Sequence, residues 1–532
     1  MPGMAKATKR TATAGAGRPA KSGEPASAAR SPERPRDKAS SAVIMAVILV
    51  LIVSATVRLY QLQRPATVVF DETYYAKDAN TILHGYLGSN PGYPWEPGKE
   101  VSWPHPEYGK WAIATGVAVF GNRSIGWRIA PAIAGTILLA LVYPIGRRVG
   151  LSPPWALLAL VLAASDFLGI VQSRIATLDV FVALWTALCT YLALRYVQTG
   201  HRTAWLVLCG LAGGIALGTK WSGLYALLAA AAILLLFRRR PWREPGGKAV
   251  AHALRDLVLP VVALVVLPAA LYLLSYTLYF AKGHHTWSQW VELQHQMWWF
   301  NTRLHATHPY ASKPWTWIFD YRPVSYYYVY DTAGVHDIIS MGNPLLWWAS
   351  IPSLVGLVVV GIYRRSRLLL VVPVVVALLY LPWLSTSRTS FMYYLTPVAP
   401  FLATAVALAF RELARGRLPE SRYAASCFIG ATAITAVFWY QIGEAARWLF
   451  WTLPGQGSTD LARVVVVVAA AAAAGLVVGL ALSERTRTWW PYIAWLFAGA
   501  VAGICIAFLP ILIDLTITRD HFYHLMWFRN WI

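Results

Sequence analysis

The sequence predicts an all-α polytopic membrane protein, and three observations support that prediction. First, 57% of the 532 residues are hydrophobic and only 13% are charged, whereas a soluble domain carries about 25% charged residues. Second, apolar runs of about 20 residues, the length that crosses a bilayer, recur along the chain. Third, Lys and Arg gather in short tracts between these runs, which explains the net charge of +22 without a nucleic-acid partner. An ordinary soluble enzyme, a disordered protein and a nucleic-acid-binding module are excluded.

The chain begins with a polar, basic tail. Residues 1–41 are rich in Ala, Pro, Ser, Lys and Arg and lack apolar periodicity, which is typical of disorder. The first apolar run, 42–59, is not followed by a small-residue cleavage site, so we expect a retained helix rather than a cleaved signal peptide. The basic flank of this helix predicts a cytoplasmic N-terminus. Residues 42–532 then form one transmembrane domain.

Alternating basic clusters and apolar runs give the remaining spans. The segments 60–125 and 281–344 fall on the side opposite the basic clusters, so we expect them to be large extracytoplasmic loops. Together with the first run, the apolar runs predict about 13 spans. The expected later spans are 127–146, 154–172, 177–196, 204–219, 221–237, 256–280, 345–362, 368–385, 391–410, 423–441, 461–482 and 489–513.

Both outside loops are rich in Trp and Tyr, and long structured loops usually carry function. The segments Trp111–Phe120 and Trp287–Phe300 are aromatic and amphipathic. This pattern favours helices that lie in the plane of the membrane interface.

Asp71 and Glu72 are adjacent carboxylates just after the first helix. One interpretation is a solvated loop turn. The other is a general base with a substrate-orienting acid beside it, because an apolar, aromatic wall raises the pKa of a carboxylate toward that use. The pair alone does not decide between them.

Isolated cations stand at the outer membrane face, where the positive-inside rule predicts few. They could reach lipid headgroups or pair with Asp166 or Asp179. We favour a cluster that binds a lipid-linked phosphate, because Arg and Lys are the side chains that recognise phosphate. These cations are Arg128, Arg174, Lys220 and Arg388.

The residue pattern predicts no metal and no cofactor. Six of the 12 histidines lie in the second outside loop, but their spacing fits no standard zinc pattern. The four cysteines all lie within apolar runs, which argues against both a disulfide framework and a thiolate zinc site. In the segment 105–110, His105 and Lys110 offer hydrogen-bond donors, or the segment is only a helix-entry turn.

These stretches, in their order and spacing, resemble the protein O-mannosyltransferase family, glycosyltransferase family 39, which has the GT-C fold. The resemblance runs from about residue 45 to the end of the sequence, and each motif alone is weak. The matching stretches are Asp71-Glu72, His105–Lys110, Arg128, Ser173–Phe181, Thr219–Leu224, Gly342–Pro344 and Arg388–Pro397.

Several positions depart from the family pattern. Glu107 and Tyr108 stand where the family has Pro-Leu, Thr219 replaces a Ser, and the His of the family's Phe-x-Tyr-His-Tyr stretch is absent. The second loop is too short for the MIR domain of eukaryotic members, so the resemblance points to a bacterial, actinobacterial type. The family implies eleven helices, so we expect a GT-C protein of about 11–13 transmembrane helices with two large extracytoplasmic loops that carry interfacial helices.

The resemblance implies transfer of mannose from polyprenyl-phosphate mannose to Ser or Thr hydroxyls of secreted or membrane proteins during translocation, with anomeric inversion. Asp71 is then the base, and Glu72 binds the acceptor or supports Asp71. Arg128 and Lys220 neutralise the donor phosphate without a metal, with Arg174 and Arg388 as weaker candidates. The expected donor and acceptor pocket also includes His105, Lys110, Asp179, Tyr74 and Trp221.

The resemblance also implies a setting. We expect a multi-pass plasma-membrane protein with its active site on the extracytoplasmic face, in contact with membrane lipids. Docking on the secretion channel is a hypothesis from the implied function and not from the residues. The main alternative is another GT-C transferase that uses a polyprenyl-phosphate sugar to modify a cell-envelope glycan or lipid. A transporter and a non-catalytic scaffold are less favoured, because the carboxylates lie at helix ends and no internal repeat is evident.

Overall fold

A computed structural model describes residues 39–84, 101–238, 257–416, 421–438 and 488–532. Residues 1–38 of the predicted tail and the predicted span 461–482 lie outside these ranges. Within them, seven helices are long and apolar enough to cross a membrane. They are α1 (Ser41–Leu59), α4 (Ser124–Arg148), α7 (Asp179–Gln198), the helix Leu257–Ala281, α14 (Pro344–Tyr363), Arg367–Ser385 and α20 (Trp490–Leu512).

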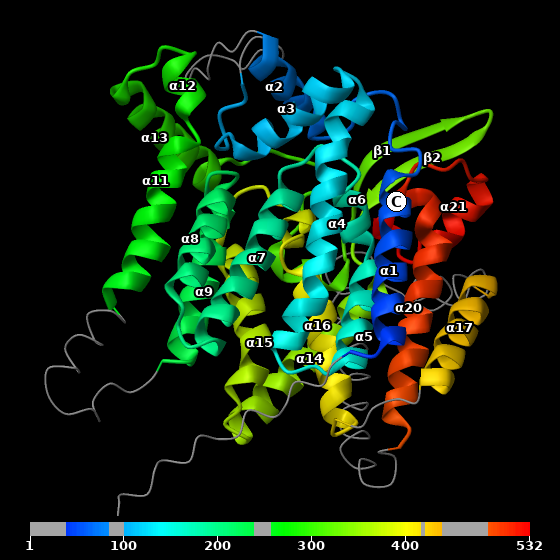
Figure 1. The fold of residues 1–532 in the computed structure, drawn as a ribbon. Coiled ribbons are helices and arrows are strands. Elements are labelled where there is room, and N and C mark those ends of the chain that lie inside the picture. Colours follow the sequence, from blue (N-terminus) through cyan, green and yellow to red (C-terminus); the bar gives the residue numbers. More distant parts are fainter. Residues whose placement is uncertain (1–38, 85–100, 239–256, 417–420, 439–487) are drawn as a thin grey trace, which may run out of the picture. The chain divides into compact units, whose positions relative to one another are not determined.

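Shorter apolar helices complete the helical part of the described chain (Figure 1). The predicted tight hairpin over 204–237 consists of α8 (Thr203–Leu217), the short turn η1 (Trp221–Gly223) and α9 (Leu224–Leu236). The helix Leu257–Ala281 contains η3 (Val262–Val266), α11 (Leu267–Leu274) and α12 (Thr277–Ala281), and Arg367–Ser385 comprises α15 (Arg367–Tyr380) and η5 (Leu381–Ser385). The shorter helices are α5 (Pro153–Ala164), α8 (Thr203–Leu217), η1 (Trp221–Gly223), α9 (Leu224–Leu236), α16 (Ala399–Leu413) and α17 (Ser421–Val437). The chain is therefore a multi-pass membrane protein.

Two predicted spans are wrong in their bounds. The predicted helix 154–172 is broken, because α5 ends at Ala164 and α6 (Phe167–Gln172) begins after Asp166, whose carboxylate caps it by accepting from Gly169 N at 3.0 Å. The predicted helix 391–410 begins late, at Ala399, because 392–395 form a separate short turn, η6 (Met392–Leu395). Both breaks place polar backbone at the end of the bundle that carries the outside loops.

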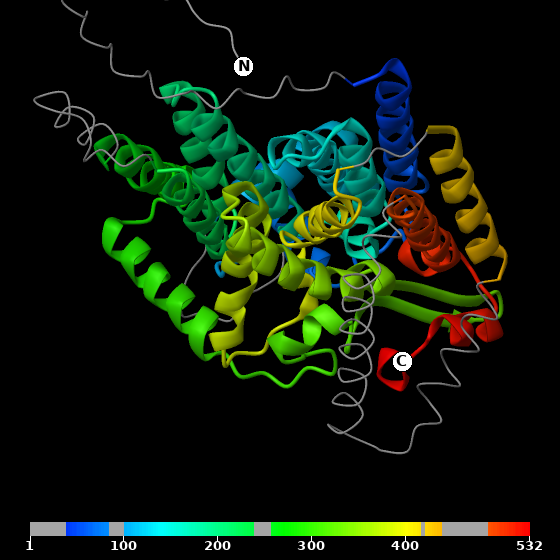
Figure 2. The ribbon, with the colours of Figure 1, turned by 90° about the horizontal axis from the view of Figure 1, so that it is seen from below.

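Burial separates central helices from peripheral ones. In α7, 72% of the 18-residue apolar stretch that would cross the membrane is buried inside the protein, compared with 11% in α1. Figures 1 and 2 show α7 among the other helices and α1 at the edge, beside α20. The first residue of α7 is Asp179, so this carboxylate begins the most enclosed span.

The first outside loop folds into two helices, α2 (Glu72–His84) and α3 (Tyr108–Phe120). The expectation of a helix over 111–120 is confirmed, with a start three residues earlier. The helix α2 was not predicted, although its buried residues, which include Tyr75, Ala76 and Ala79, follow a helical spacing. Figure 1 shows both helices above the spanning bundle, where α3 packs against α2 and α4.

The second outside loop contains a helix and a hairpin. The expected amphipathic helix over 287–300 is α13 (Trp287–Arg303), which begins with a capping box of Thr286 and Gln289. After the turn η4 (Pro314–Phe319), strands β1 (Val324–Asp331) and β2 (Gly334–Ser340) pair antiparallel. This hairpin is a small β element within the predicted helical fold, and its run of Tyr and Val favours strands. Of the last elements, α21 (Arg519–Leu525) packs beside β2, and η7 (Arg529–Trp531) contacts Asp320 and Tyr321, which lie before β1.

Candidate active site

A cavity of about 590 Å³ opens where the outside loops meet the spanning helices. Its wall comes from four separate parts of the chain: the first outside loop, the turn between α8 and η1, residues 300–308 of the second outside loop, and the segment 388–394. Five of the predicted site residues line it: Asp71, Tyr74, His105, Lys220 and Arg388. The structure therefore brings together the Asp71 carboxylate, the rings of Tyr74 and His105, and two cations, Lys220 and Arg388.

Asp71 lies in the cavity wall just before α2. Burial raises the pKa of its carboxyl group to about 6, while the Lys220 charge and a hydrogen bond from Tyr393 oppose this rise. The Tyr393 hydroxyl donates to Asp71 Oδ2 at 3.4 Å. A carboxylate with a pKa of about 6 is mostly ionised at neutral pH yet remains basic enough to accept a proton.

The backbone before Asp71 is strained. Phe70 has a φ of +47°, a left-handed conformation that bulky residues rarely adopt. Its ring stacks on Tyr326 of β1, with the centroids 4.3 Å apart, and meets the Tyr393 ring edge-on at 5.6 Å. These packed rings hold the turn that presents Asp71 to the cavity.

Lys220 stands in the turn after α8 and pairs with Asp179 at the start of α7. Its ammonium lies 2.9 Å and 3.0 Å from the two carboxylate oxygens of Asp179. It also lies 4.5 Å from the centroid of the Tyr394 ring. Of the alternatives left open for this cation, pairing with Asp179 is confirmed, and the same amine lines the cavity.

The first loop docks on this turn through the segment 105–110. Tyr108 N donates to Gly218 O at 3.1 Å. Gly109 lies so close to Leu178 and Thr219 that a Cβ there would meet them at 2.7 Å and 2.9 Å. The glycine is therefore required by close approach, and it brings His105 and Lys220 to one cavity.

Lys110 does not line the cavity. It forms a buried ion pair with Asp78 of α2 at 3.4 Å and donates to the Ser102 carbonyl oxygen. Asp78 also accepts from Ser102 N at 2.8 Å. This network fastens the segment that leads to His105 onto α2, so Lys110 positions the wall of the cavity rather than contacting its contents.

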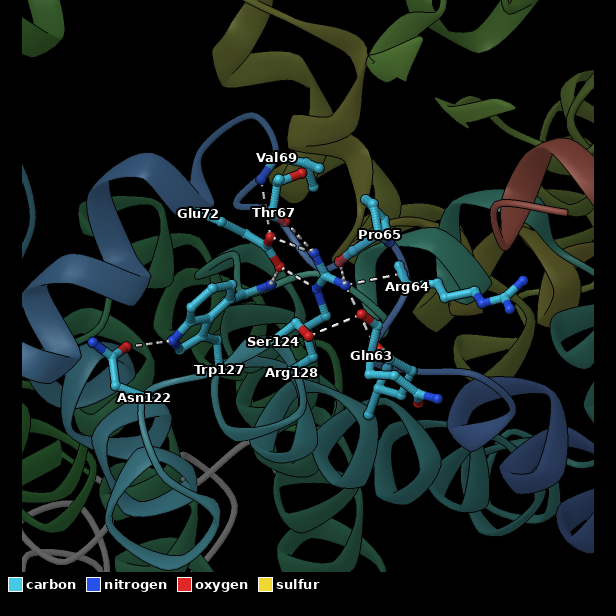
Figure 3. A network of polar contacts seen from close by, with 12 residues as sticks. Gln63, Arg64, Pro65, Thr67, Val69, Glu72, Asn122, Ser124, Trp127 and Arg128 are labelled. Atoms are coloured by element: carbon cyan, nitrogen blue, oxygen red, sulfur yellow. Dashed lines mark hydrogen bonds and ion pairs between the residues drawn. The ribbon is translucent and has the colours of Figure 1, made fainter. Parts of the chain in front are cut away.

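Glu72 and Arg128 form a closed pair behind Asp71, with exposed fractions of 0% and 1% (Figure 3). Nε and Nη2 of Arg128 donate to the two Glu72 carboxylate oxygens, each at 2.7 Å. Glu72 also accepts from Val69 N at 3.0 Å and from Ala176 N at 2.9 Å. The other donors of Arg128 reach backbone carbonyls, those of Leu62, Arg64, Pro65 and Thr67.

This closed pair argues against a phosphate-binding role for Arg128 and an acceptor-binding role for Glu72, and it favours the other role expected of Glu72, the support of Asp71. Arg128 does not reach the cavity, and its donors already have partners in the protein, so the geometry does not support it as a phosphate ligand. Glu72 is equally enclosed, so the geometry does not support direct contact with an acceptor. The pair joins the first loop, α4 and the segment after α6, and it thereby fixes the residue next to Asp71.

Arg174 also lies away from the cavity. Its Nη1 donates to three carbonyls at the end of α1, those of Val57, Arg58 and Tyr60, at 2.7–3.0 Å. Burial lowers the pKa of its guanidinium to about 10, which leaves it charged at neutral pH. It stabilises the end of a helix, and the structure does not bring it to a phosphate site.

Arg388 stands between two cavities. It donates to Asn301 Oδ1 at 2.8 Å and to the Tyr394 hydroxyl at 3.1 Å. It lines both the Asp71 cavity and an adjacent cavity of about 700 Å³. That second cavity is lined by aromatic and polar side chains and includes Trp221, so Trp221 belongs to the neighbouring space and not to the Asp71 pocket.

Sequence reasoning gave no site role to Tyr393, Tyr394 or Phe70. The segment 391–394 contributed only to the family resemblance, and the signal that could have found it was its polar-aromatic character next to Arg388. Within the described ranges, no group of three or more His, Cys, Asp or Glu side chains could hold a metal ion. What the cavity offers chemically is one base, two cations and an aromatic wall.

Comparisons with known proteins identify the family of this chain. The model of dolichyl-phosphate-mannose-protein mannosyltransferase matches residues 98–282, and that of the C-terminal four-transmembrane region of protein-O-mannosyltransferase matches residues 286–445. The polyprenol-phosphate-mannose–protein mannosyltransferase of Mycolicibacterium smegmatis is 30% identical over 477 residues, covering 76% of this chain and 89% of the relative. Its counterpart in Mycobacterium tuberculosis is 31% identical over 444 residues, covering 71% and 82%.

Solved structures share the fold. The Saccharomyces cerevisiae protein O-mannosyltransferase Pmt1–Pmt2 complex bound to the sugar donor aligns with a TM-score of 0.67 and 13% identity, covering 93% of each chain. ArnT from Cupriavidus metallidurans bound to undecaprenyl phosphate aligns with a TM-score of 0.52 and 18% identity, covering 88% of this chain and 77% of ArnT. Both likenesses show the GT-C fold. Together with the matched family models and the coverage of the mycobacterial relatives, they show that this chain belongs to the protein O-mannosyltransferase family.

Proposed function

We propose that this protein transfers mannose from polyprenyl-phosphate mannose to Ser or Thr hydroxyls of secreted or membrane proteins as they cross the membrane. The observation that carries the mechanism is the placement of Asp71, Lys220 and Arg388 around one cavity. A base and two cations are what such a transfer needs, because the hydroxyl must lose a proton and the phosphate must leave with its charge neutralised.

The reaction is a single displacement at the anomeric carbon. The acceptor hydroxyl gives its proton to Asp71 while its oxygen forms a bond to the anomeric carbon. The bond from that carbon to the phosphate oxygen breaks, and its electron pair leaves with the polyprenyl phosphate. Attack from the face opposite the phosphate inverts the anomer, through an oxocarbenium-like transition state.

Lys220 and Arg388 are the cations that we assign to the phosphate. Asp179 accepts from Lys220, which fixes the ammonium without removing it from the cavity wall. Arg388 has five N–H groups, and its contacts to Asn301, Tyr394 and its own neighbour Thr389 orient the guanidinium at the junction of the two cavities. No step requires a metal ion or a cofactor.

The experiment is sugar transfer in membranes. Labelled polyprenyl-phosphate mannose and a Ser/Thr/Pro/Ala-rich peptide are supplied to wild type and to Asp71→Asn, with Asp520→Asn on the exposed surface of α21 as matched control. We expect Asp71→Asn to lose at least about a hundredfold in rate and the control to retain activity. EDTA should change neither result. Failure of folded wild type to label any peptide would shift the function to a glycan or lipid acceptor.

We place the cavity on the extracytoplasmic face and the N-terminus in the cytoplasm. This is supported by Arg147-Arg148 in the last turn of α4 and Arg364-Arg365 after α14, which lie at the helix ends opposite the outside loops. A membrane-impermeant thiol reagent on intact cells should label Ser288→Cys and spare Gly416→Cys; the opposite pattern would reverse the orientation. Docking on the secretion channel remains part of the proposal, and co-purification with its subunits in mild detergent tests it.

A further inference from the structure

His105 has a ring nitrogen that the protein leaves without a partner. Its Nδ1 is buried and accepts or donates no hydrogen bond within the described part of the chain. The rest of the ring is partly exposed and lines the Asp71 cavity. Pro104 and Pro106 flank the residue and restrict its backbone. Nε2 is therefore the nitrogen that a bound molecule can reach.

The His105 ring is neutral at physiological pH. Burial lowers the pKa of the imidazole well below its usual value, and the charges of Lys220, Lys110 and Arg388 lower it further. A neutral imidazole carries one proton, which sits on either Nδ1 or Nε2. The surroundings of the two nitrogens decide which one.

The buried position of Nδ1 favours one tautomer. A buried N–H without an acceptor is rarely tolerated in proteins, whereas a buried acceptor without a donor is tolerated better. The proton is therefore assigned to Nε2 and the lone pair to Nδ1. The cavity wall then presents an uncharged N–H donor beside two cations.

We propose that His105 is a sugar-binding residue whose Nε2–H donates a hydrogen bond to a hydroxyl oxygen of the mannose on the lipid donor. This inference rests on the proposed function and adds to it a residue that recognises the sugar. The phosphate already has Lys220 and Arg388 to meet its charge, and the uncharged donor is suited to an uncharged oxygen. The Tyr75 ring, 6.4 Å from the His105 ring, adds an aromatic surface beside it.

The test is equilibrium binding to purified full-length protein in detergent. Two probes are used: radiolabelled polyprenyl-phosphate mannose, and polyprenyl phosphate as its unlabelled competitor. His105→Phe removes the donor and keeps ring volume, whereas His105→Gln places an amide N–H near the former Nε2 position. His295→Phe, on the exposed face of α13, is the matched control. Each variant is first shown to elute as a single symmetrical peak.

We expect His105→Phe to weaken binding of the mannose donor roughly tenfold and to leave polyprenyl phosphate nearly unchanged. His105→Gln should stay within about threefold of wild type, and His295→Phe should match it. Equal weakening of both ligands would overturn the inference, because the contact would then be to phosphate. It would also be overturned if His105→Gln lost as much affinity for the mannose donor as His105→Phe, or if His105→Phe bound the donor like wild type.

The same measurements separate this inference from the proposed function. Wild type that binds the donor but labels no peptide contradicts the assignment of a protein acceptor, and the His105 comparison then still decides the sugar contact. Wild type that binds polyprenyl phosphate but gains nothing from the mannose overturns both the donor assignment and the role of His105.

Discussion

Glu72, the residue directly after Asp71 in the chain, accepts two hydrogen bonds of 2.7 Å from Arg128. The pair is buried, and Glu72 reaches back to the backbone of Val69 and across to that of Ala176. The two residues on either side of Asp71 are thus held by different means, Phe70 by ring stacking and Glu72 by charge. A catalytic carboxylate gains accuracy of position from such support.

Breaking this pair should destabilise the protein rather than weaken donor binding selectively. Arg128→Met leaves the Glu72 charge buried and unpaired, which costs about 3–5 kcal/mol. We expect a lower melting temperature and a loss of transfer. Thermal unfolding in detergent checks the result, and the double variant Arg128→Met/Glu72→Gln should recover part of the lost stability.

A different outcome would restore Arg128 as a phosphate ligand. That outcome is an Arg128→Met protein with the wild-type melting temperature and a weakened affinity for polyprenyl phosphate. The contacts of Arg128 with the first loop would then have to open when the donor binds.

Transfer should depend on pH through Asp71. Burial raises the pKa of this carboxyl group to about 6, so at that pH half of the protein molecules carry a protonated Asp71. Well below this pKa, the ionised fraction falls tenfold for each pH unit of acidification. We expect kcat/KM to be flat above neutral pH and to fall along an acidic limb centred near the Asp71 pKa. A profile that stays flat well below this pKa would contradict Asp71 as the base.

Lys220 should set the position of that limb. Its positive charge lowers the pKa of Asp71, so removing it should raise that pKa and move the acidic limb to higher pH. Lys220→Met alone would leave Asp179 buried without its partner, and the double variant Lys220→Met/Asp179→Asn avoids this. The Asp179 charge itself raises the pKa of Asp71, so the pH profile of the double variant is compared with that of Asp179→Asn alone. The limb of the double variant should lie at higher pH than the limb of Asp179→Asn. Coincident limbs in these two variants would mean that Lys220 acts only on the phosphate.

The spanning helices could be predicted because each is a continuous apolar run, which can be recognised without knowing what the helix packs against. It could not predict the break at Asp166, since that carboxylate finds Asn343 and Trp347 far along the chain. The β-hairpin was not predicted because the aromatic residues of the second outside loop were interpreted as a sign of interfacial helices, although its Tyr-rich segment also favours strands.

The candidate site shows the same limit. Unusual cations at the outer face were recognised from sequence, but their partners were not. Arg174 contacts carbonyls more than a hundred residues away. Arg128 contacts Glu72, for which the sequence left open either acceptor binding or support of Asp71. Tyr393 was missed because its relation to Asp71 spans 322 residues.

The last residues should matter for stability although they lie far from Asp71. Trp531 is buried and donates to the Asp320 carbonyl at 2.7 Å, and Arg322 donates to the Asn530 carbonyl at 2.5 Å. These contacts secure the segment that leads into β1, whose Tyr326 supports Phe70. Trp531→Ala should therefore lower the free energy of unfolding by about 3–5 kcal/mol, and Arg519→Ala on the exposed face of α21 should change it little. Thermal unfolding in detergent checks this. An unchanged melting temperature in Trp531→Ala would mean that the hairpin is held by its own pairing and by Ile517, independently of the contacts made by Trp531.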